Sequence, residues 1–346
     1  MSRSVGIGLV GLGRIGRGIV RELAKAGWPV RVNAIAEINP RGRPEPEMVA
    51  NLAYLLEFDS TYGRFPGRVE ADGTRLILDG TPAKVFFSPD PAQVDWRARG
   101  CEIVVEASGD ERVGAAAARL VDQGLKVLIT RSAAHADIVL IRGFNWNAYD
   151  PARHRVVACG SCTLNAAAPV VKLVERHWGV EELNALSVHP ALSADRLLDA
   201  PAGEFAEGRG AWAIRPVRSG LAHGLQLLMP ELKGKVSAMT MRVPTQVVNA
   251  LVLVFNLRRP PASVSEVMER FEEASREELA GVVEVNRGRY GQGLVSVDFT
   301  GAEASAIVDR LWCDLRGRML RMVVWHDNEA GYCRRVVESI GLVAGA

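Results

Sequence analysis

Hydrophobic and polar residues along the first third of the chain follow two different periods. Residues 5–10 (VGIGLV) form a short apolar run that ends in a glycine turn, whereas residues 14–27 place apolar side chains at helical spacing. Both hydrophobic patterns recur further along the chain. They predict strands at 30–36, 102–108 and 126–130 and an alanine-rich helix at about 111–124. Alternating strands and helices predict a parallel sheet covered by helices on both faces.

The spacing changes after residue 162. Longer strands are predicted at 183–189, 238–244, 250–257, 293–299 and 319–326. One helix is predicted over about 263–278, where Ser263 precedes Glu266 by three residues and indicates a capping box. Because strands outnumber helical crossovers here, they predict a largely antiparallel sheet with helices on one face. The last residues, 327–346, again predict a helix.

Length and composition fit two domains of an α/β protein. The 346 residues are 48% hydrophobic and 24% charged, which is typical of a globular chain. We expect residues 1–161, completed by the C-terminal helix 327–346, to form a doubly wound parallel domain. Residues 162–326 are expected to form a second, α+β domain that contains the catalytic residues.

Charge and cysteine content exclude several classes of protein. The formal net charge is +2 and no run of like charges exists, so neither nucleic acid nor a membrane is indicated as a partner. The glycine-rich N-terminus is a poor signal peptide. Five cysteines, an odd number, do not fit a disulfide framework and favour a reducing cytoplasm.

A glycine motif follows the first predicted strand and opens the first predicted helix. In Gly11-x-Gly13-x-x-Gly16, the first glycine permits a tight turn and the second lets backbone approach a pyrophosphate. The third lets helix and strand pack closely. This arrangement predicts a Rossmann-type dinucleotide-binding domain whose helix N-terminus faces the phosphates.

An acidic residue ends the second predicted strand. Glu37 lies 21 residues after Gly16, where a carboxylate can accept hydrogen bonds from both ribose hydroxyls and repel a 2′-phosphate. It therefore favours NAD over NADP. Arg41 and Arg43 follow closely and keep NADP open as the alternative, because either could bind a phosphate.

Cys159 and Cys162 have the spacing C-x-x-C, which allows three interpretations. A metal site would need two more soft ligands, and no second C-x-x-C or H-x-x-H exists, so we predict no metal. A redox pair would normally lie early in a small domain, whereas this pair lies in the middle of a long chain. The third interpretation makes Cys162 a nucleophile in the first turn of a helix over 161–177, where the helix dipole lowers a thiol pKa.

A nucleophilic cysteine needs a base close to it in space. Among the six histidines, His189 ends the predicted strand 183–189, where a side chain can project from the edge of a sheet. His326 ends another predicted strand and is a second candidate. The others lie in polar or helical surroundings that suggest surface positions.

Motifs along nearly the whole chain match a known family. They include GLGRIGR (11–17), LAYLLEFDSTYGRF (52–65), SCTLN (161–165), MPELKGK (229–235), MRVPT (241–245) and WHDNEAGY (325–332). The chain resembles the phosphorylating glyceraldehyde-3-phosphate dehydrogenases and the related erythrose-4-phosphate dehydrogenases. The resemblance implies an NAD-dependent aldehyde dehydrogenase, a cytoplasmic homotetramer, and oligomerisation through the second domain.

The resemblance also implies the roles of individual residues. Cys162 attacks an aldehyde, His189 takes the hydroxyl proton, and phosphate (or water, in the erythrose-phosphate branch) releases the thioester. The implied cofactor ligands are Gly11, Gly13, Arg14, Ile15, Gly16, Glu37, Thr130, Asn328 and Tyr332. The implied ligands of substrate and inorganic phosphate are Ser161, Thr163, Ser219, Gly220 and Arg242.

Several substrate positions of the family are changed. Leu192 stands where the family has a phosphate-binding threonine, and Ala194 where it has an acidic residue. A gapless count places Phe205 and Ala206 at a pair of arginines that the family usually has. Three arginines of the same segment are candidates to replace that pair: Arg209, Arg215 and Arg218.

Three functions remain open at this point. The first is oxidation of a phosphorylated sugar aldehyde, by default glyceraldehyde 3-phosphate. The second is the same chemistry on another aldehyde, because the changed positions weaken phosphate binding. The third is an NAD-binding regulatory protein without turnover, against which the retained Cys162, His189 and Asn328 argue.

Overall fold

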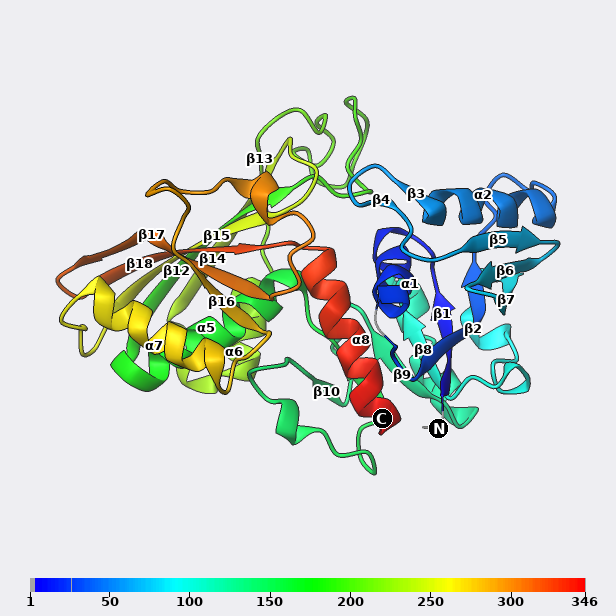
Figure 1. The fold of residues 1–346 in the computed structure, drawn as a ribbon, viewed down its shortest axis with the longest axis horizontal. Coiled ribbons are helices and arrows are strands. Elements are labelled where there is room, and N and C mark those ends of the chain that lie inside the picture. Colours follow the sequence, from blue (N-terminus) through cyan, green and yellow to red (C-terminus); the bar gives the residue numbers. More distant parts are fainter. Residues whose placement is uncertain (1–3, 26, 346) are drawn as a thin grey trace. The chain divides into compact units, whose positions relative to one another are not determined.

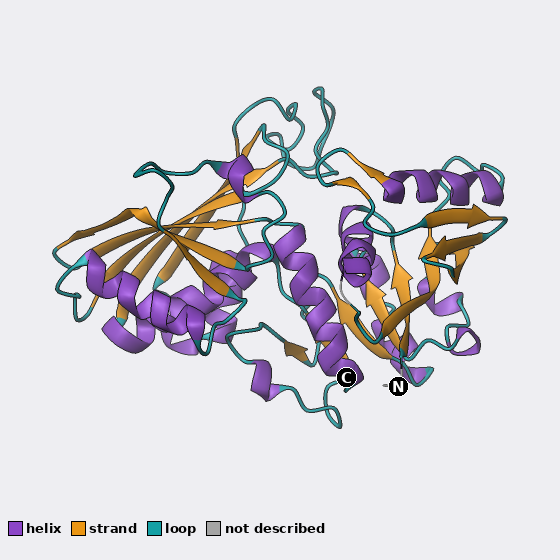
Figure 2. Ribbon diagram, viewed as in Figure 1, coloured by secondary structure: helices purple, strands orange, loops and turns teal. Residues whose placement is uncertain are grey.

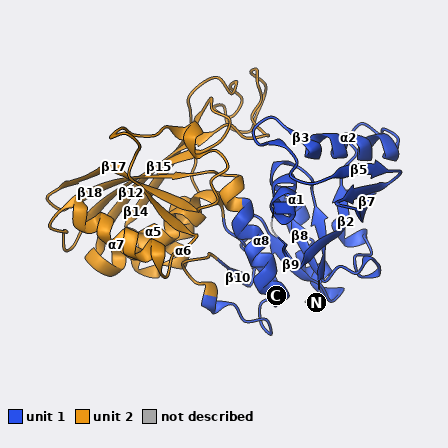
Figure 3. Ribbon diagram, viewed as in Figure 1, with its two compact units in different colours: residues 1–140, 147–160, 333–346 blue, residues 141–146, 161–332 orange. Residues whose placement is uncertain are grey.

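The computed structural model describes residues 4–25 and 27–345. They form two compact units, which Figure 3 colours separately. Unit 1 comprises residues 4–25, 27–140, 147–160 and 333–345, and unit 2 comprises residues 141–146 and 161–332. The predicted domain limits were residues 161 and 327. Residues 141–146 and 327–332 belong to unit 2 in the structure, and the predicted limits remain a prediction.

Unit 1 is built on a nine-stranded sheet (Figure 1). Its strand order is β10-β11-β9-β8-β1-β2-β7-β6-β5. All pairs are parallel from β10 to β7, and β7-β6 and β6-β5 are antiparallel. The strands are β1 (Val5–Val10), β2 (Val30–Glu37), β5 (Val69–Asp72), β6 (Arg75–Leu78), β7 (Thr81–Phe87), β8 (Ile103–Glu106), β9 (Lys126–Ile129), β10 (Ile138–Val139) and β11 (Val156–Ala158).

The helices of unit 1 connect these strands. They are α1 (Arg14–Lys25), α2 (Glu45–Glu57), α3 (Glu111–Gly114) and α4 (Ala117–Asp122), with short 3₁₀ turns η1 (Pro91–Gln93) and η2 (Arg97–Arg99) and a small ribbon of β3 (Phe58–Asp59) and β4 (Gly63–Arg64). A third 3₁₀ turn, η3 (Trp146–Ala148), begins in unit 2 and ends in unit 1. All six residues of β1 are buried, as expected for a central parallel strand. The predicted helix 14–27 ends at Lys25, and residue 26 lies outside the described residues.

Unit 2 is built on a seven-stranded sheet with the order β13-β14-β12-β15-β18-β17-β16. Its strands are β12 (Val180–Pro190), β13 (Arg215–Val217), β14 (Val236–Val243), β15 (Asn249–Leu257), β16 (Val283–Asn286), β17 (Ala306–Arg316) and β18 (Met319–His326). Two of its six pairs, β12-β14 and β16-β17, are parallel and the rest are antiparallel. The predicted combination of a parallel-rich sheet with a largely antiparallel one is therefore confirmed.

Three helices lie on one face of the sheet of unit 2 (Figure 1, Figure 2). They are α5 (Cys162–Trp178), α6 (Leu221–Leu228) and α7 (Val264–Arg276), and the 3₁₀ turns are η4 (Pro230–Leu232) and η5 (Ser296–Phe299). Residues of β15 alternate between buried and half-buried, which fits a sheet with one fully covered face. The candidate site described below lies at the ends of β12 and β14.

Two local predictions were wrong. Residues 293–299 do not form a strand, because the Asp298 carboxylate accepts the Val295 N–H and closes the turn η5, leaving Val295 and Val297 exposed. The strand of this region is β17, which periodicity did not reveal. The single helix expected at 111–124 is divided into α3 and α4, with Gly114, a poor helix former, at the break.

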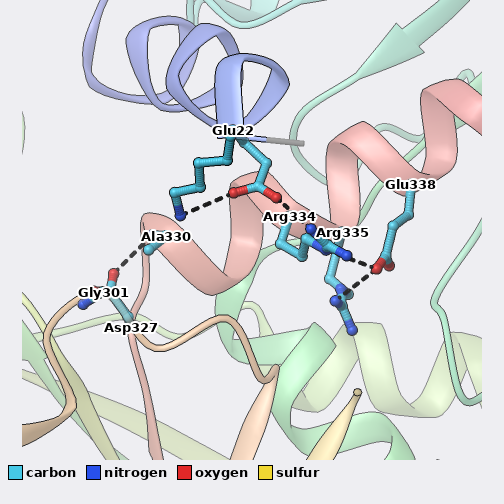
Figure 4. Close-up of polar contacts among 8 residues, drawn as sticks. Glu22, Gly301, Asp327, Ala330, Arg334, Arg335 and Glu338 are labelled. Carbon is cyan, nitrogen blue, oxygen red and sulfur yellow. Dashed lines mark hydrogen bonds and ion pairs between the residues drawn. The ribbon is translucent and has the colours of Figure 1, made fainter. Parts of the chain in front are cut away.

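Helix ends follow side-chain capping. Ser263 Oγ accepts the Glu266 N–H, whereas the Glu266 carboxylate accepts the Ala262 N–H, so only half of the predicted capping box forms. The last helix, α8 (Ala330–Ala344), begins three residues later than the predicted 327. The Asp327 carboxylate precedes it and accepts the Ala330 N–H at 2.8 Å (Figure 4).

Residues 333–344 of α8 are bound within unit 1 by charged side chains (Figure 4). Arg334 Nη1 donates to the buried Glu22 carboxylate of α1 at 2.7 Å. Cys333 packs against α1 so closely that a Cβ added to Gly18 would lie 2.5 Å from its sulfur. Residues 333–344 therefore complete the packing of unit 1.

Candidate active site

Cys162 is the first residue of α5. Ser161 precedes it in extended conformation, and its hydroxyl accepts the Leu164 N–H at 3.1 Å, which fixes the start of the helix. The backbone N–H groups of the first turn of a helix have no intrahelical partner. Cys162 is half-buried and its thiol is free, so its sulfur lies at a helix N-terminus rather than in a disulfide.

His189 lies next to this sulfur. It is the penultimate residue of β12, only 7% exposed, and its Nε2 lies 3.8 Å from Cys162 Sγ. Its other nitrogen, Nδ1, lies 2.9 Å from the Pro190 carbonyl oxygen and 2.6 Å from Arg242 Nη1. Arg242 is the register partner of His189 on the parallel strand β14, which is why the two side chains meet.

The protonation states of the pair are set mainly by burial. Burial and the Arg242 charge lower the pKa of His189 to about 4, so the imidazole is neutral near pH 7. Burial also raises the pKa of the Cys162 thiol and outweighs the opposing effects of Thr163, Arg242 and the helix N–H groups. Burial therefore opposes the thiol acidity that the helix N-terminus predicts.

The contacts of Nδ1 determine which tautomer can act as a base. Nδ1 cannot donate to the Pro190 oxygen and accept from Arg242 at the same time. With the proton on Nδ1, Nε2 presents its lone pair to Cys162; with Arg242 donating to Nδ1, Nε2 carries the proton toward the sulfur. Arg242 Nη1 also lies 3.2 Å from the Pro190 oxygen. When Arg242 donates to this oxygen instead of to Nδ1, the Nδ1–H of His189 can donate to the same oxygen.

Arg242 belongs to a cluster of buried charges that the sequence did not reveal. Asp195 lies 3.6 Å from Arg242 Nε and 3.0 Å from Arg215 Nη2. Arg215 and Arg242 are register partners on the antiparallel strands β13 and β14. Asp195 was not a predicted site residue, and the only signal was its position directly after Ala194, where the family has its acidic residue.

The remaining predicted substrate ligands are partly engaged in local structure. Ser161 and Ser219 each accept a backbone N–H at the start of a helix, the second one from Leu221 at 3.3 Å. Gly220 is the exposed residue before α6. The Thr163 hydroxyl is buried, 3.9 Å from Cys162 Sγ and 3.5 Å from Asn249 Nδ2.

The two predicted nicotinamide ligands of unit 2 are buried. Asn328 is 4% exposed and its Oδ1 accepts the Val248 N–H at 3.2 Å, which leaves its amide nitrogen as a donor. Tyr332 is 4% exposed. His326, the second base candidate, is 2% exposed and neither ring nitrogen has a hydrogen-bond partner in the described chain; its pKa is lowered to about 3 by burial and the nearby His189.

The glycine loop of unit 1 has the geometry of a phosphate-binding turn. Gly11 has a φ of 85°, and a Cβ on Gly16 would lie 2.1 Å from the Gly11 carbonyl oxygen. Gly13, in contrast, has no atom within 4 Å of the position of a Cβ and is exposed. Gly11 and Gly16 are thus required by the backbone conformation and close packing of the loop, while Gly13 leaves space for a ligand.

The other predicted cofactor ligands surround this loop or the carboxyl ends of the same sheet. Glu37 Oε2 accepts the Leu12 N–H at 2.6 Å and Oε1 accepts the Ile38 N–H at 2.8 Å, so its half-buried carboxylate is fixed beside the loop. Arg14 forms an ion pair with Asp59 at 2.6 Å. Ile15 is half-buried in the first turn of α1, and Thr130 directly follows β9. This donor set fits NAD, while Arg41 and Arg43 are exposed.

The described residues contain no group of three or more histidine, cysteine or acidic side chains that could hold a metal ion. Among the same residues, no helix is both long and apolar enough to span a bilayer.

A glycine-loop nucleotide-binding unit in one chain with a half-buried cysteine beside a buried histidine is typical of nucleotide-dependent dehydrogenases. Comparison with known families supports that class. The NAD-binding domain of glyceraldehyde 3-phosphate dehydrogenase matches residues 5–112, and the C-terminal domain of the same enzyme matches residues 161–328. NAD is therefore the cofactor, and the chain is an NAD-dependent oxidoreductase.

Curated relatives agree over almost the full length. The chain is 34% identical to a glyceraldehyde-3-phosphate dehydrogenase of Priestia megaterium, across 99% of this chain and 98% of the relative. The corresponding enzyme of Geobacillus stearothermophilus is 34% identical across 99% and 98%. Glyceraldehyde-3-phosphate dehydrogenase 1 of Drosophila melanogaster is 33% identical across 96% and 97%. The chain belongs to the glyceraldehyde-3-phosphate dehydrogenase family, of which it is a divergent member.

Proposed function

We propose that the protein oxidises an aldehyde with NAD through a thioester on Cys162, with His189 as the general base. The observation that carries this proposal is the distance of 3.8 Å between Cys162 Sγ and His189 Nε2. A neutral imidazole is required of a base, and the low pKa of His189 keeps it neutral near pH 7. A neutral thiol then needs this base in order to become a nucleophile.

His189 Nε2 accepts or returns the proton at every step of the proposed reaction. With Nδ1–H donating to the Pro190 oxygen, Nε2 accepts the thiol proton as the sulfur bonds to the aldehyde carbon. Nε2 returns this proton to the former carbonyl oxygen, which gives a hemithioacetal. During oxidation Nε2 takes the hydroxyl proton again, and the carbon–oxygen double bond of the thioester forms.

Backbone groups stabilise the negative charge that develops on the reacting oxygen. The Cys162 N–H at the start of α5 is the donor that we assign to this oxygen, because the first turn has unpaired N–H groups and the positive end of the helix dipole. NAD, when bound, supplies the hydride acceptor. We infer that Gly11, Gly13 and Gly16 admit its pyrophosphate and that Glu37 accepts its ribose hydroxyls.

The remaining cofactor and acyl-transfer roles rest on the family resemblance. Asn328 is proposed to hold the carboxamide of the nicotinamide, with Tyr332 and Thr130 close to the ring. Ser219 and Gly220, with the Thr163 hydroxyl, are proposed to admit inorganic phosphate as the acyl acceptor, and water is the alternative. Glyceraldehyde 3-phosphate is the default substrate from the family, and a cytoplasmic homotetramer stays a prediction.

The test is NADH formation by the purified chain with NAD and a panel of aldehydes, with and without inorganic phosphate. The panel contains glyceraldehyde 3-phosphate, erythrose 4-phosphate and their unphosphorylated counterparts. We expect NADH with at least one aldehyde, none with Cys162→Ser, and a faster rate with phosphate if phosphate is the acceptor. No NADH above the Cys162→Ser control with any aldehyde would refute the proposal and favour a binding protein without turnover.

A further inference from the structure

A network of buried polar side chains begins at the Cys162 sulfur. Thr163 Oγ1 lies 3.9 Å from Cys162 Sγ and accepts a hydrogen bond from Asn249 Nδ2 at 3.5 Å. The same amide nitrogen donates to Ser187 Oγ at 2.9 Å, and the Ser187 hydroxyl donates to Asn249 Oδ1 at 3.2 Å. Thr163 and Ser187 are buried, and Asn249 is fully buried. The nucleophile is therefore connected to two side chains that have no role in the proposed reaction so far, Asn249 and Ser187.

Three elements of unit 2 bring this network together. Thr163 lies in the first turn of α5, Ser187 lies on β12, and Asn249 is the first residue of β15. Alternate residues of a strand point to the same face, so Ser187 and His189 project from the same face of β12. The strands β12 and β15 are antiparallel neighbours, and the Asn249 amide reaches across them to Ser187. The network thus lies on the same face of the sheet as the base of the proposed reaction.

The contact with Asn249 decides where the Thr163 hydroxyl proton points. An amide nitrogen only donates, so Thr163 Oγ1 is the acceptor in this contact. Among the described residues, the one other hydrogen-bond partner of this hydroxyl is Cys162 Sγ. The Thr163 O–H is therefore directed toward the sulfur, where it stabilises a thiolate more than a neutral thiol.

This hydrogen bond opposes the effect of burial on the nucleophile. Burial raises the pKa of the Cys162 thiol, and the hydrogen bond with the Thr163 side chain is the largest of the effects that lower it. A donor to the Thr163 oxygen polarises the O–H bond and strengthens the hydrogen bond to sulfur. Asn249 thus influences Cys162 without contacting it.

We propose that Asn249 is a positioning residue for the nucleophile, because it holds the Thr163 hydroxyl in the orientation that donates to the Cys162 sulfur and favours the thiolate. Ser187 holds the Asn249 amide in turn. This role rests on the proposed function, in which Cys162 attacks the aldehyde, but it does not depend on which aldehyde is oxidised. After acylation the sulfur carries no negative charge and is a weak acceptor, so the same hydroxyl is free to turn to the acyl acceptor.

Alkylation of Cys162 by iodoacetamide tests this role without turnover. The full chain is treated over a range of pH, and the peptide that contains Cys162 is quantified by mass spectrometry. The rate follows the thiolate fraction, so its pH dependence gives the pKa of the thiol. Thr163→Val removes the donor and is expected to slow alkylation at pH 7 about tenfold or more. Asn249→Ala is expected to slow it about threefold to tenfold, a smaller effect because 3.5 Å is long for a hydrogen bond.

A double variant separates positioning from a purely structural effect. If Asn249 acts through Thr163, adding Asn249→Ala to a chain that already carries Thr163→Val changes the rate less than about twofold. Thr163→Ser keeps the hydroxyl and is expected to alkylate within about threefold of the wild-type rate.

Asn286→Ala is the matched control. Asn286 Nδ2 also donates to a side chain of a neighbouring strand, Asp309 at 3.2 Å, but it lies on the edge strand β16 of the same sheet. We expect this variant to alkylate within about twofold of the wild-type rate, because distant sites act independently.

An unchanged rate in Asn249→Ala, or an equal fall with and without Thr163→Val, would overturn this role of Asn249. Faster alkylation would also overturn it, since the amide oxygen would then face Thr163. If Asn249→Ala does not fold, Ser187→Ala tests the same contacts, with an expected slowing of about twofold to threefold, and no slowing would contradict the proposal. A chain that shows these effects but forms no NADH with any aldehyde would refute the proposed function alone.

Discussion

The glycine loop of unit 1 and the arginine cluster of unit 2 are both suited by residue type to bind phosphate, but they differ in what already surrounds their binding groups. Gly13 has no atom within 4 Å of the position that a methyl group would occupy, whereas Arg215 and Arg242 already contact Asp195. The glycine loop thus has an open position for an anion. The arginine cluster instead combines a carboxylate of the chain with buried nitrogens of Arg215 (Nε and Nη2) and Arg242 (Nε) that have no hydrogen-bond partner among the described residues.

The largest change in rate is expected for substitution of the nucleophile, Cys162. Cys162→Ser is expected to lower kcat by about 10³-fold or more, because a serine hydroxyl is far less readily ionised and less nucleophilic than a thiol. NADH formation with the best aldehyde of the panel measures this. Cys159→Ala is the matched control, and we expect it to keep activity within about threefold, since Cys159 is buried and its thiol pKa is raised to about 12.

Loss of activity in both cysteine variants would contradict the assignment of a single nucleophile and support a C-x-x-C pair. The same outcome would remove the basis for treating Cys162 and His189 as the pair that carries the reaction.

The next effect concerns the base. His189→Asn is expected to lower kcat/KM by about 10²- to 10⁴-fold. An imidazole must be unprotonated to accept a proton, and the pKa of His189 is lowered to about 4, so wild-type kcat/KM should stay constant as pH falls from 7 to 5. Enzyme held at each pH and returned to pH 7 serves as the control for inactivation. A loss of activity centred near pH 6.5 would indicate an ordinary histidine and contradict the burial argument.

The glycine loop allows a test that separates folding from cofactor binding. Gly16→Ala places a methyl group 2.1 Å from the Gly11 carbonyl oxygen and is expected to lower the free energy of unfolding by about 1–3 kcal/mol. Gly13→Ala meets no atom and should leave stability unchanged, but weaken NAD binding about tenfold by filling the ligand space. Thermal melts and NAD titrations measure both. Equal NAD affinity for Gly13→Ala and wild type would contradict the open site.

The smallest expected effect is that of the buried His326 on the pH dependence of the free energy of unfolding. His326 has a pKa of about 3 when folded and near 6.5 when unfolded, so the unfolded chain binds more protons in this window and stability falls as pH falls. The slope is at most about 1.4 kcal/mol per pH unit for one group. His326→Phe should reduce the stability difference between pH 7 and pH 5 by about 1–2 kcal/mol in urea unfolding. The exposed His223→Gln should leave that difference unchanged, and an equal change in both variants would refute the assignment to His326.

The two anion sites also differ in how far the sequence predicted them. The strand, the turn, the helix and Glu37 of the glycine loop lie within 33 residues of one another, so local spacing and steric rules were enough to place them. Arg215 and Asp195 are joined through a turn at Leu192 and through the pairing of β13 with β14, which no local pattern specifies. The arginines were visible as candidates, but their carboxylate partners were not.

The same distinction applies to the fold. Strands with a strong apolar period, such as β1 and β15, were predicted nearly to the residue. The apolar alternation of residues 293–299 predicted a strand that does not form, because one carboxylate closes a turn and the apolar side chains face outward. Burial raises the pKa of the Cys162 thiol, which opposes the lowering predicted from its place at a helix N-terminus, because local sequence does not show how far a side chain is buried.

Cys162 is proposed to form an acyl thioester with the aldehyde substrate. Mass spectrometry of the intact chain, quenched in acid after mixing with NAD and the best aldehyde of the panel without inorganic phosphate, is the decisive experiment. We predict a covalent acyl adduct on the peptide that contains Cys162, absent without NAD and absent in Cys162→Ser. An unmodified Cys162 with every aldehyde that yields NADH would contradict this proposal.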